Sequence, residues 1–246
     1  MKKIILLFIC IQLLGCSSGD ESVSNHYINL KIDDVNNVIN GSINVSDLKV
    51  VIYLSEDDYL NDRAPFFSGN FDNGGRFSLS NNVNFQDYFI DIYTEDGSVS
   101  NFGKNYKFKS NSDSDYFQIV QPIKGSRIFI GEWNFNSYDH NHPGHSIHDR
   151  TIRNKLKISK DYSVTSLEQY NNIQFTVKYK ISVFQDNQII LKYISTSPSD
   201  MSLYPYHKIS STSISLNTSS IVINFDESSK MISFHDYADE YIFYKK

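Results

Sequence analysis

Apolar and polar residues alternate with a period of two along much of this chain. The alternation is clearest in four segments, residues 27–32, 48–54, 88–93 and 175–184. Because successive side chains of a strand point to opposite faces of a sheet, this period is typical of strands with one buried and one exposed face. Turn-forming pairs such as Asn40-Gly41 and Asp96-Gly97 separate the segments. The pattern therefore predicts an all-β chain of short antiparallel strands.

The composition also favours strands over helices. The chain has 17 Tyr and 17 Phe residues, and aromatic residues are enriched in strands. Beyond Cys16, only the ambiguous segment 163–172 has any helical periodicity. Phosphate-binding loops, dinucleotide folds and hydrolase elbows all require strand-to-helix turns, so we expect a non-catalytic protein. The formal net charge of -5 gives no basic surface for nucleic acid.

The strand pattern divides the chain into two parts. Residues 26–121 are predicted to form a small antiparallel β-sandwich, and residues 122–127 a short linker. Residues 128–246 hold roughly eight further strands, and a meander of that number closes into an antiparallel β-barrel that fits side chains or one small ligand. A second open sandwich is the alternative for this half.

The first sixteen residues have the pattern of a secretion signal. Lys2 and Lys3 precede an apolar run from Ile4 to Leu14, which is too short to cross the hydrocarbon core of a membrane. We therefore expect residues 1–15 to be a cleaved signal peptide. An ordinary secretory peptide with a coincidental cysteine is the alternative to a lipoprotein signal.

The quartet Leu13-Leu14-Gly15-Cys16 resembles the bacterial lipobox. The resemblance implies that the Cys16 thiol carries a diacylglyceryl group, that cleavage occurs before it, and that the new amino group is acylated as well, for example with palmitate. Two or more acyl chains anchor a protein firmly. Residues 16–25 would then be a lipidated tether to the membrane. The other cysteine, Cys10, lies in the segment expected to be cleaved, so the mature chain would have no thiol for a disulfide or a metal.

The residues after Cys16 indicate where the anchor lies. Ser17 is not the aspartate that retains enteric lipoproteins in the inner membrane, and Asp20-Glu21 is similar to the export tags of Bacteroidota surface lipoproteins. The resemblance implies an outer-membrane protein that faces the periplasm or the cell surface.

Motifs in the first half resemble the carboxypeptidase-regulatory-like domain. They are the strand 50–54, the turn Asp72-Asn73-Gly74-Gly75 before Arg76-Phe77, and the strand 88–93. This family has a transthyretin-like β-sandwich and serves as an accessory module without catalytic residues.

The second half opens with Gly131-x-Trp133, which resembles the first strand of lipocalin-like barrels. The resemblance implies that Trp133 plugs the closed end of the barrel beside a cation from the last strand, for which Lys245 and Lys246 are the nearest candidates. It also implies that the loop after the first strand lies across the open mouth.

That loop contains the one dense group of possible metal ligands in the chain. The group comprises His140, His142, His145 and His148. Neutral imidazole is the commonest protein ligand of zinc and copper, so these residues form a candidate Zn or Cu site. A solvated loop that happens to be rich in histidine is the alternative. Apart from this possible metal, the sequence predicts no cofactor.

These patterns predict a non-catalytic cell-envelope lipoprotein that binds a small or apolar ligand, or a protein partner. One alternative is metal binding or metal-dependent hydrolysis by the four histidines. Another is a structural subunit of an outer-membrane assembly.

Overall fold

The all-β class is confirmed by the computed structural model of the chain. The structure describes residues 25–33, 43–140, 152–170, 173–185, 187–197, 221–236 and 239–245. In these residues β-strands predominate, accompanied by the short α-helix α3 (Glu56–Leu60) and two 3₁₀ turns, η1 (Val45–Asp47) and η2 (Arg127–Phe129). No helix in this part of the chain is long and apolar enough to cross a membrane.

The first group of strands forms two sheets. One has the order β4-β1-β8 and comprises β1 (Ile28–Ile32), β4 (Arg76–Leu79) and β8 (Gln118–Val120). The other has the order β3-β2-β5-β6-β9 and comprises β2 (Lys49–Tyr53), β3 (Phe67–Asn70), β5 (Asp87–Tyr93), β6 (Val99–Ser100) and β9 (Ile123–Lys124), while β7 (Lys107–Lys109) pairs with β5. All these pairs are antiparallel except β1 with β8. Strand β9 falls within the segment expected to be a linker.

The core of this sandwich follows from the period-two pattern. The alternate residues Ile28, Leu30 and Ile32 of β1 are at most 1% exposed, and they belong to one apolar cluster with Ile90 and Ile92 of β5. Burial of such side chains is the main stabilising contribution to the fold.

The second half is a closed barrel and not a second sandwich. Its eight strands are β10 (Gly131–His140), β11 (Ile152–Ile158), β12 (Ser163–Tyr170), β13 (Ile173–Gln185), β14 (Gln188–Ser197), β15 (Ile221–Asp226), β16 (Met231–Asp236) and β17 (Asp239–Lys245). Each pairs with the next along the chain, and β10 pairs with β17 to close the cylinder. The ambiguous segment 163–172 contains the strand β12. Its alternate residues Val164 and Ser166 are both buried in the barrel core.

One end of the barrel is closed by the turn that precedes β10. Trp133 is fully buried, and its Nε1 donates a hydrogen bond of 2.8 Å to the carbonyl oxygen of Phe129 in η2. Lys245 of β17 places its Nζ 5.5 Å from the centre of the indole ring and 3.1 Å from the carbonyl oxygen of Ile128. Of the two lysines considered as the cationic partner of Trp133, Lys245 is thus in contact, and Lys246 lies outside the described residues.

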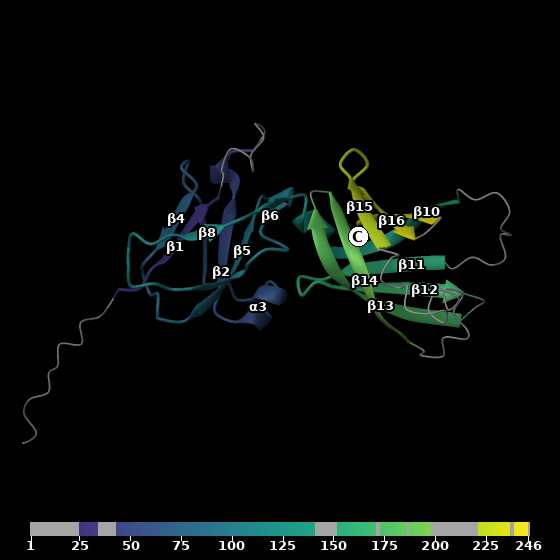
Figure 1. The fold of residues 1–246 in the computed structure, drawn as a ribbon, viewed down its shortest axis with the longest axis horizontal. Helices are drawn as coiled ribbons and strands as arrows, with labels where there is room; N and C mark the ends of the chain where they lie inside the picture. Colours follow the sequence, from purple (N-terminus) through teal and green to yellow (C-terminus); the bar gives the residue numbers. More distant parts are fainter. Residues whose placement is uncertain are drawn as a thin grey trace, which may run out of the picture.

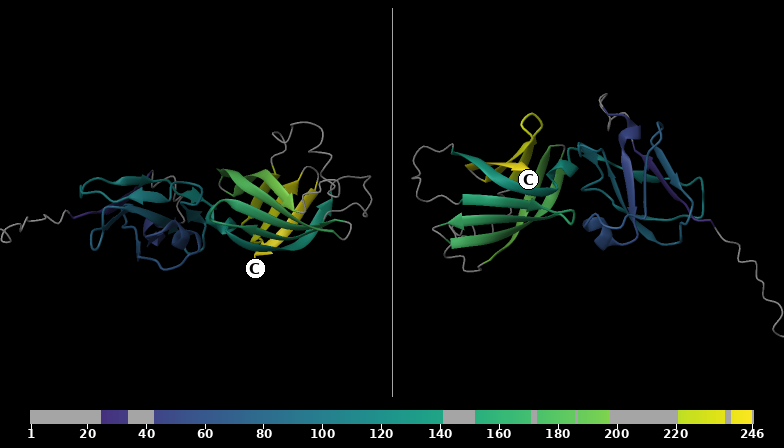
Figure 2. Two further views of the ribbon diagram at one scale, coloured as in Figure 1. Left: turned by 90° about the horizontal axis from the view of Figure 1, so that it is seen from below. Right: turned by 180° about the vertical axis from the view of Figure 1, so that it is seen from behind.

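The sandwich packs against this closed end, so the two bodies lie side by side along the long axis of the molecule (Figures 1 and 2). The ring of Phe102 in the sandwich lies 5.1 Å from Phe184 and 5.4 Å from Tyr162 in the barrel. Next to it, Gly103 has a φ of +88°, and a Cβ there would overlap the Phe184 ring. The opposite end of the barrel, where β10 ends and β11 begins, points away from the sandwich.

Candidate functional site

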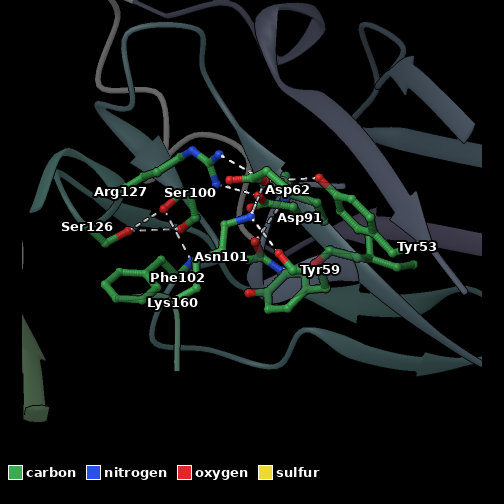
Figure 3. Close-up of polar contacts among 12 residues, drawn as sticks. Tyr53, Tyr59, Asp62, Asp91, Ser100, Asn101, Phe102, Ser126, Arg127 and Lys160 are labelled. Carbon is green, nitrogen blue, oxygen red and sulfur yellow. Dashed lines mark hydrogen bonds and ion pairs between the residues drawn. The ribbon is translucent and has the colours of Figure 1, made fainter. Parts of the chain in front are cut away.

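A buried cluster of charges lies between the sandwich and the barrel (Figure 3). Lys160, in the turn between β11 and β12, is only 3% exposed. Its Nζ donates hydrogen bonds to Asp91 Oδ2 at 2.6 Å, Asp62 Oδ1 at 2.5 Å and the Tyr59 carbonyl oxygen at 3.0 Å. All three acceptors belong to the sandwich, so a lysine of the barrel is held by a group of oxygen atoms of the sandwich.

Arg127 provides the second cation of the cluster. Its guanidinium donates to the Asp91 carboxylate, lies 3.8 Å from Asp62 Oδ1, and stacks 3.9 Å from the centre of the Tyr93 ring. Burial alone would lower the pKa of Arg127, but the carboxylates of Asp91 and Asp62 outweigh it and raise the pKa above its ordinary value. Asp91, which is 1% exposed, is therefore neutralised by two cations.

Neutral hydrogen bonds complete the interface beside these charges. The hydroxyls of Ser100 and Ser126 lie 2.6 Å apart, and the backbone N–H of Phe102 donates to Ser100 Oγ at 3.2 Å. Asn101 is fully buried and bonds to the backbone of β5, donating to the Ile90 carbonyl oxygen at 2.9 Å. The polar groups of the cluster are thus paired with one another, which favours a role in fixing the barrel on the sandwich over binding a ligand.

We expect the free energy of unfolding to fall as the pH rises above about 10. Burial first, and then the charge of a nearby aspartate, raises the pKa of Tyr53 and of Tyr59 well above the ordinary value. A hydrogen bond to Glu56, followed by burial, raises the pKa of Tyr106 to about 12. Unfolded tyrosines ionise at about pH 10. From there to about pH 12 the unfolded state has lost protons that the folded state still holds, so stability decreases.

Urea unfolding at about pH 8 and about pH 11 measures this loss. The variants Tyr53→Phe and Tyr59→Phe should each lose less stability between these two pH values than the original protein. Tyr116→Phe is the matched control, because Tyr116 is 53% exposed. An equal loss in all three variants would contradict the assignment to the buried tyrosines.

Polar residues also line part of the barrel interior. Ser166 and Glu168 of β12 are fully buried, and Thr196 of β14 is 8% exposed. The Cα register places Ser166 opposite Val177, and Val177 opposite Thr196, so these side chains cross three strands at one level of the barrel. Tyr193 adds a hydroxyl 2.9 Å from Thr196 Oγ1. Ser166, Glu168, Tyr193 and Thr196 together are called the polar strip below.

The Ser166 hydroxyl has no hydrogen-bond partner in the described part of the chain. A buried hydroxyl without a partner costs about 1–3 kcal/mol, so a bound molecule that supplies a partner would be favoured there. The strands that complete the barrel bring apolar residues to the same core, among them Ile223, Ile232 and Phe243. The interior thus offers an apolar wall and a wall with hydrogen-bonding groups.

The histidine cluster is not brought together by the described structure. His140 is the last residue of β10, at the barrel end away from the sandwich, and its Cα pairs with that of Asp239. His142, His145 and His148 lie outside the described residues, as does Cys16. Among the residues that are described, no group of three or more His, Cys, Asp or Glu side chains is arranged to hold a metal ion. The metal site and the lipidated cysteine stay predictions.

Comparison of this chain with protein-family models, with curated proteins and with solved structures finds no match. The fold and the barrel interior by themselves define the class of protein, a β-sandwich joined to a closed antiparallel barrel with a mixed polar and apolar core.

Proposed function

We propose that this protein is a lipid-anchored, non-catalytic protein of the cell envelope whose barrel binds a small molecule with an apolar body and a hydrogen-bonding group. The observation that carries the proposal is the polar strip inside the barrel, in particular the Ser166 hydroxyl, which has no hydrogen-bond partner among the described residues. A ligand pocket is usually apolar with a few polar groups that fix the orientation of the ligand. The interior of this barrel has that composition.

The lipocalin-like features of the barrel support the same proposal. Gly131-x-Trp133 opens β10, Trp133 is buried at the closed end, and Lys245 of the last strand lies over its ring. Eight-stranded barrels of this size hold either a side-chain core or one small ligand. With one end blocked by η2 and the sandwich, a ligand would enter at the other end, where His140 lies.

The lipobox-like quartet that ends at Cys16 supports the membrane anchor, and the residues that follow it support an outer-membrane address in a Bacteroidota-type envelope. The charge cluster around Lys160 would also set the orientation of the barrel on the sandwich. Because it fixes the barrel by its closed end, the ligand would enter on the side away from the sandwich.

Binding of a fluorescent fatty acid, an anthroyloxy-labelled stearate, tests the proposal. Trp133 is the only tryptophan, so energy transfer from it to the probe reports occupancy of the barrel. We expect saturable binding of one probe per protein. Ser166→Ala should weaken binding by several-fold, since one hydrogen bond contributes about 0.5–1.5 kcal/mol.

Ser195→Ala is the matched control, because Ser195 is an exposed residue of β14. Native mass spectrometry of protein extracted from envelopes would show whether a small molecule co-purifies. Lack of saturable probe binding together with lack of any co-purified small molecule would overturn the ligand-binding proposal. Saturable binding that Ser166→Ala leaves unchanged would overturn only the part assigned to the polar strip.

A further inference from the structure

Three large apolar side chains of the sandwich are exposed. Phe85 is 62% exposed, Tyr116 53% and Ile119 51%. They come from two segments, the loop before β5 and the stretch that leads into and through β8. In Figure 1 the sheet that contains β1 and β8 lies on the side of the sandwich away from the barrel. The exposed fractions of Phe85, Tyr116 and Ile119 show that the contact between the two bodies does not cover them.

Contacts on this side connect the segments to one another. The Phe85 ring lies 5.4 Å from that of His26, just before β1, and Lys109 Nζ lies 4.4 Å from the centre of the Phe85 ring. Lys109 also exchanges two hydrogen bonds with the side chain of Gln118, the residue before Ile119. Phe85, Lys109, Tyr116 and Ile119 are called the aromatic patch below.

The chain enters the sandwich next to this patch. Tyr27 and Asn111 form a β-bridge through hydrogen bonds of 2.7 and 2.9 Å. Asn29 Nδ2 donates to the Ser114 carbonyl oxygen at 2.8 Å, two residues before Tyr116. The first described residues of the chain are thus held against the loop that carries part of the patch.

The position of the predicted anchor limits how far this side can be from a bilayer. Eight residues lie between Cys16 and Asn25, and a fully extended chain of that length spans at most about 30 Å. A short tether of this kind keeps its two ends at a high effective concentration. Even a weak affinity of the nearest surface for the bilayer would therefore keep that surface in contact with it.

The chemistry of the patch suits the interfacial region of a bilayer. Phenylalanine, tyrosine and isoleucine bury apolar surface at the boundary between headgroups and acyl chains, where aromatic residues are enriched. A lysine can extend over such side chains and keep its ammonium group among the phosphates, as Lys109 does over Phe85. Asp113 and Asp115 in the same loop keep this side from being strongly basic, so apolar contact would supply most of the affinity.

We infer that the aromatic patch rests in the headgroup region of the bilayer that holds the lipidated Cys16, with the barrel end at which β10 ends directed away from the membrane. The inference rests on the anchor in the proposed function, and it adds an orientation that an anchor alone does not impose. A tether without a docking surface would let the sandwich rotate freely.

Quenching by brominated phospholipids tests this orientation. The full lipidated protein is placed in vesicles of phosphatidylethanolamine and phosphatidylglycerol that contain the brominated lipid. Tryptophan is introduced at Phe85→Trp or, as a second position on the patch, at Tyr116→Trp. Ile194→Trp is the matched control, because Ile194 is 56% exposed on β14 of the barrel. Buried Trp133 gives the same background in every variant.

We expect quenching of the patch tryptophans at least about twofold stronger than that of Ile194→Trp. Flotation of the protein with the vesicles checks the anchor separately. Protein that does not float would overturn the anchor and the docking together. Protein that floats but shows equal quenching at the patch and at the control would overturn the docking alone. Shielding of Phe85→Trp from aqueous iodide in native envelopes, without lipid quenching in vesicles, would also overturn it and indicate a protein partner.

Discussion

Replacing Lys160 with methionine is expected to lower the free energy of unfolding by about 3–5 kcal/mol, the usual result of removing one partner from a buried ion pair. Lys160 Nζ supplies hydrogen bonds to Asp91 and Asp62, and both Lys160 and Asp91 are at most 3% exposed. Methionine fills a similar volume but donates no hydrogen bond. Asp91 would then keep only Arg127 as a counter-ion, and the Tyr59 carbonyl oxygen would lose its donor.

Urea unfolding measures the effect, followed both by circular dichroism and by the fluorescence of Trp133, which reports on the barrel alone. A protein of two bodies can unfold in two steps, and noncoincident curves would reveal this. Lys155→Met is the matched control. Lys155 forms an ion pair of 2.8 Å with Glu132, but their side chains are 37% and 34% exposed, so we expect a loss of less than about 1 kcal/mol. Equal losses in the two variants would contradict a special role for Lys160.

The double variant Lys160→Met with Asp91→Leu separates the loss of the pair from the cost of leaving a charge unpaired. Replacing both partners by apolar residues removes the buried carboxylate that has lost one of its two counter-ions, so we expect part of the stability to return. Arg127 would limit this recovery, because it too pairs with Asp91. A double variant whose loss equals the sum of the losses of Lys160→Met and Asp91→Leu alone would indicate that Asp91 stabilises the sandwich independently of Lys160.

Much of the fold could be predicted because strand formation leaves a local pattern. The alternating segments 27–32, 48–54 and 88–93 correspond to β1, β2 and β5. Closure of the barrel could not be derived in the same way. It depends on the pairing of β10 with β17, about a hundred residues later, and the register of that pair is set by side chains that meet only after folding.

The charge cluster was missed for a related reason. Lys160 and Asp91 are 69 residues apart in the sequence, and the turn that holds Lys160 has no motif that indicates an interface. One signal was available. Asp91 interrupts the apolar strand β5 between Ile90 and Ile92, where a charge on a solvated face is the simplest interpretation. The second face of that strand is in fact covered, by Tyr59 of α3 and by Lys160 of the barrel.

The polar strip was missed because the alternation in β12 is ambiguous. Val164, Ser166 and Glu168 share one face, and two of the three are polar. A pattern of this kind predicts a mixed or exposed face, since polar residues are mostly found at the surface. All three are fully buried, because β12 pairs with β11 and β13 in the closed barrel and this face of β12 points into the interior.

Replacing Trp133 with alanine is the second change from which we expect a large effect, a loss of about 3–5 kcal/mol in the free energy of unfolding. Trp133 is fully buried, and its indole packs in the barrel core beneath the Lys245 side chain. Truncation would leave a cavity at the closed end of the barrel. It would also leave the buried carbonyl oxygen of Phe129 without the donor at 2.8 Å that holds η2 over this end. Circular dichroism must follow the unfolding, because the variant has no tryptophan.

Trp133→Phe distinguishes these two contributions. Trp133→Phe keeps most of the apolar volume of the side chain but has no donor. Its loss in free energy of unfolding, after the part caused by the smaller ring is subtracted, measures the hydrogen bond to Phe129. Tyr244→Ala is the control, because Tyr244 is 45% exposed on β17 and its Cα pairs with that of Asn134, next to Trp133. We expect the control to lose less than about 1 kcal/mol, since exposed substitutions of this kind have small effects. If Trp133→Ala were no more harmful than Tyr244→Ala, η2 and the sandwich would close the barrel without the indole, and the resemblance of β10 to a lipocalin-like first strand would lose its structural basis.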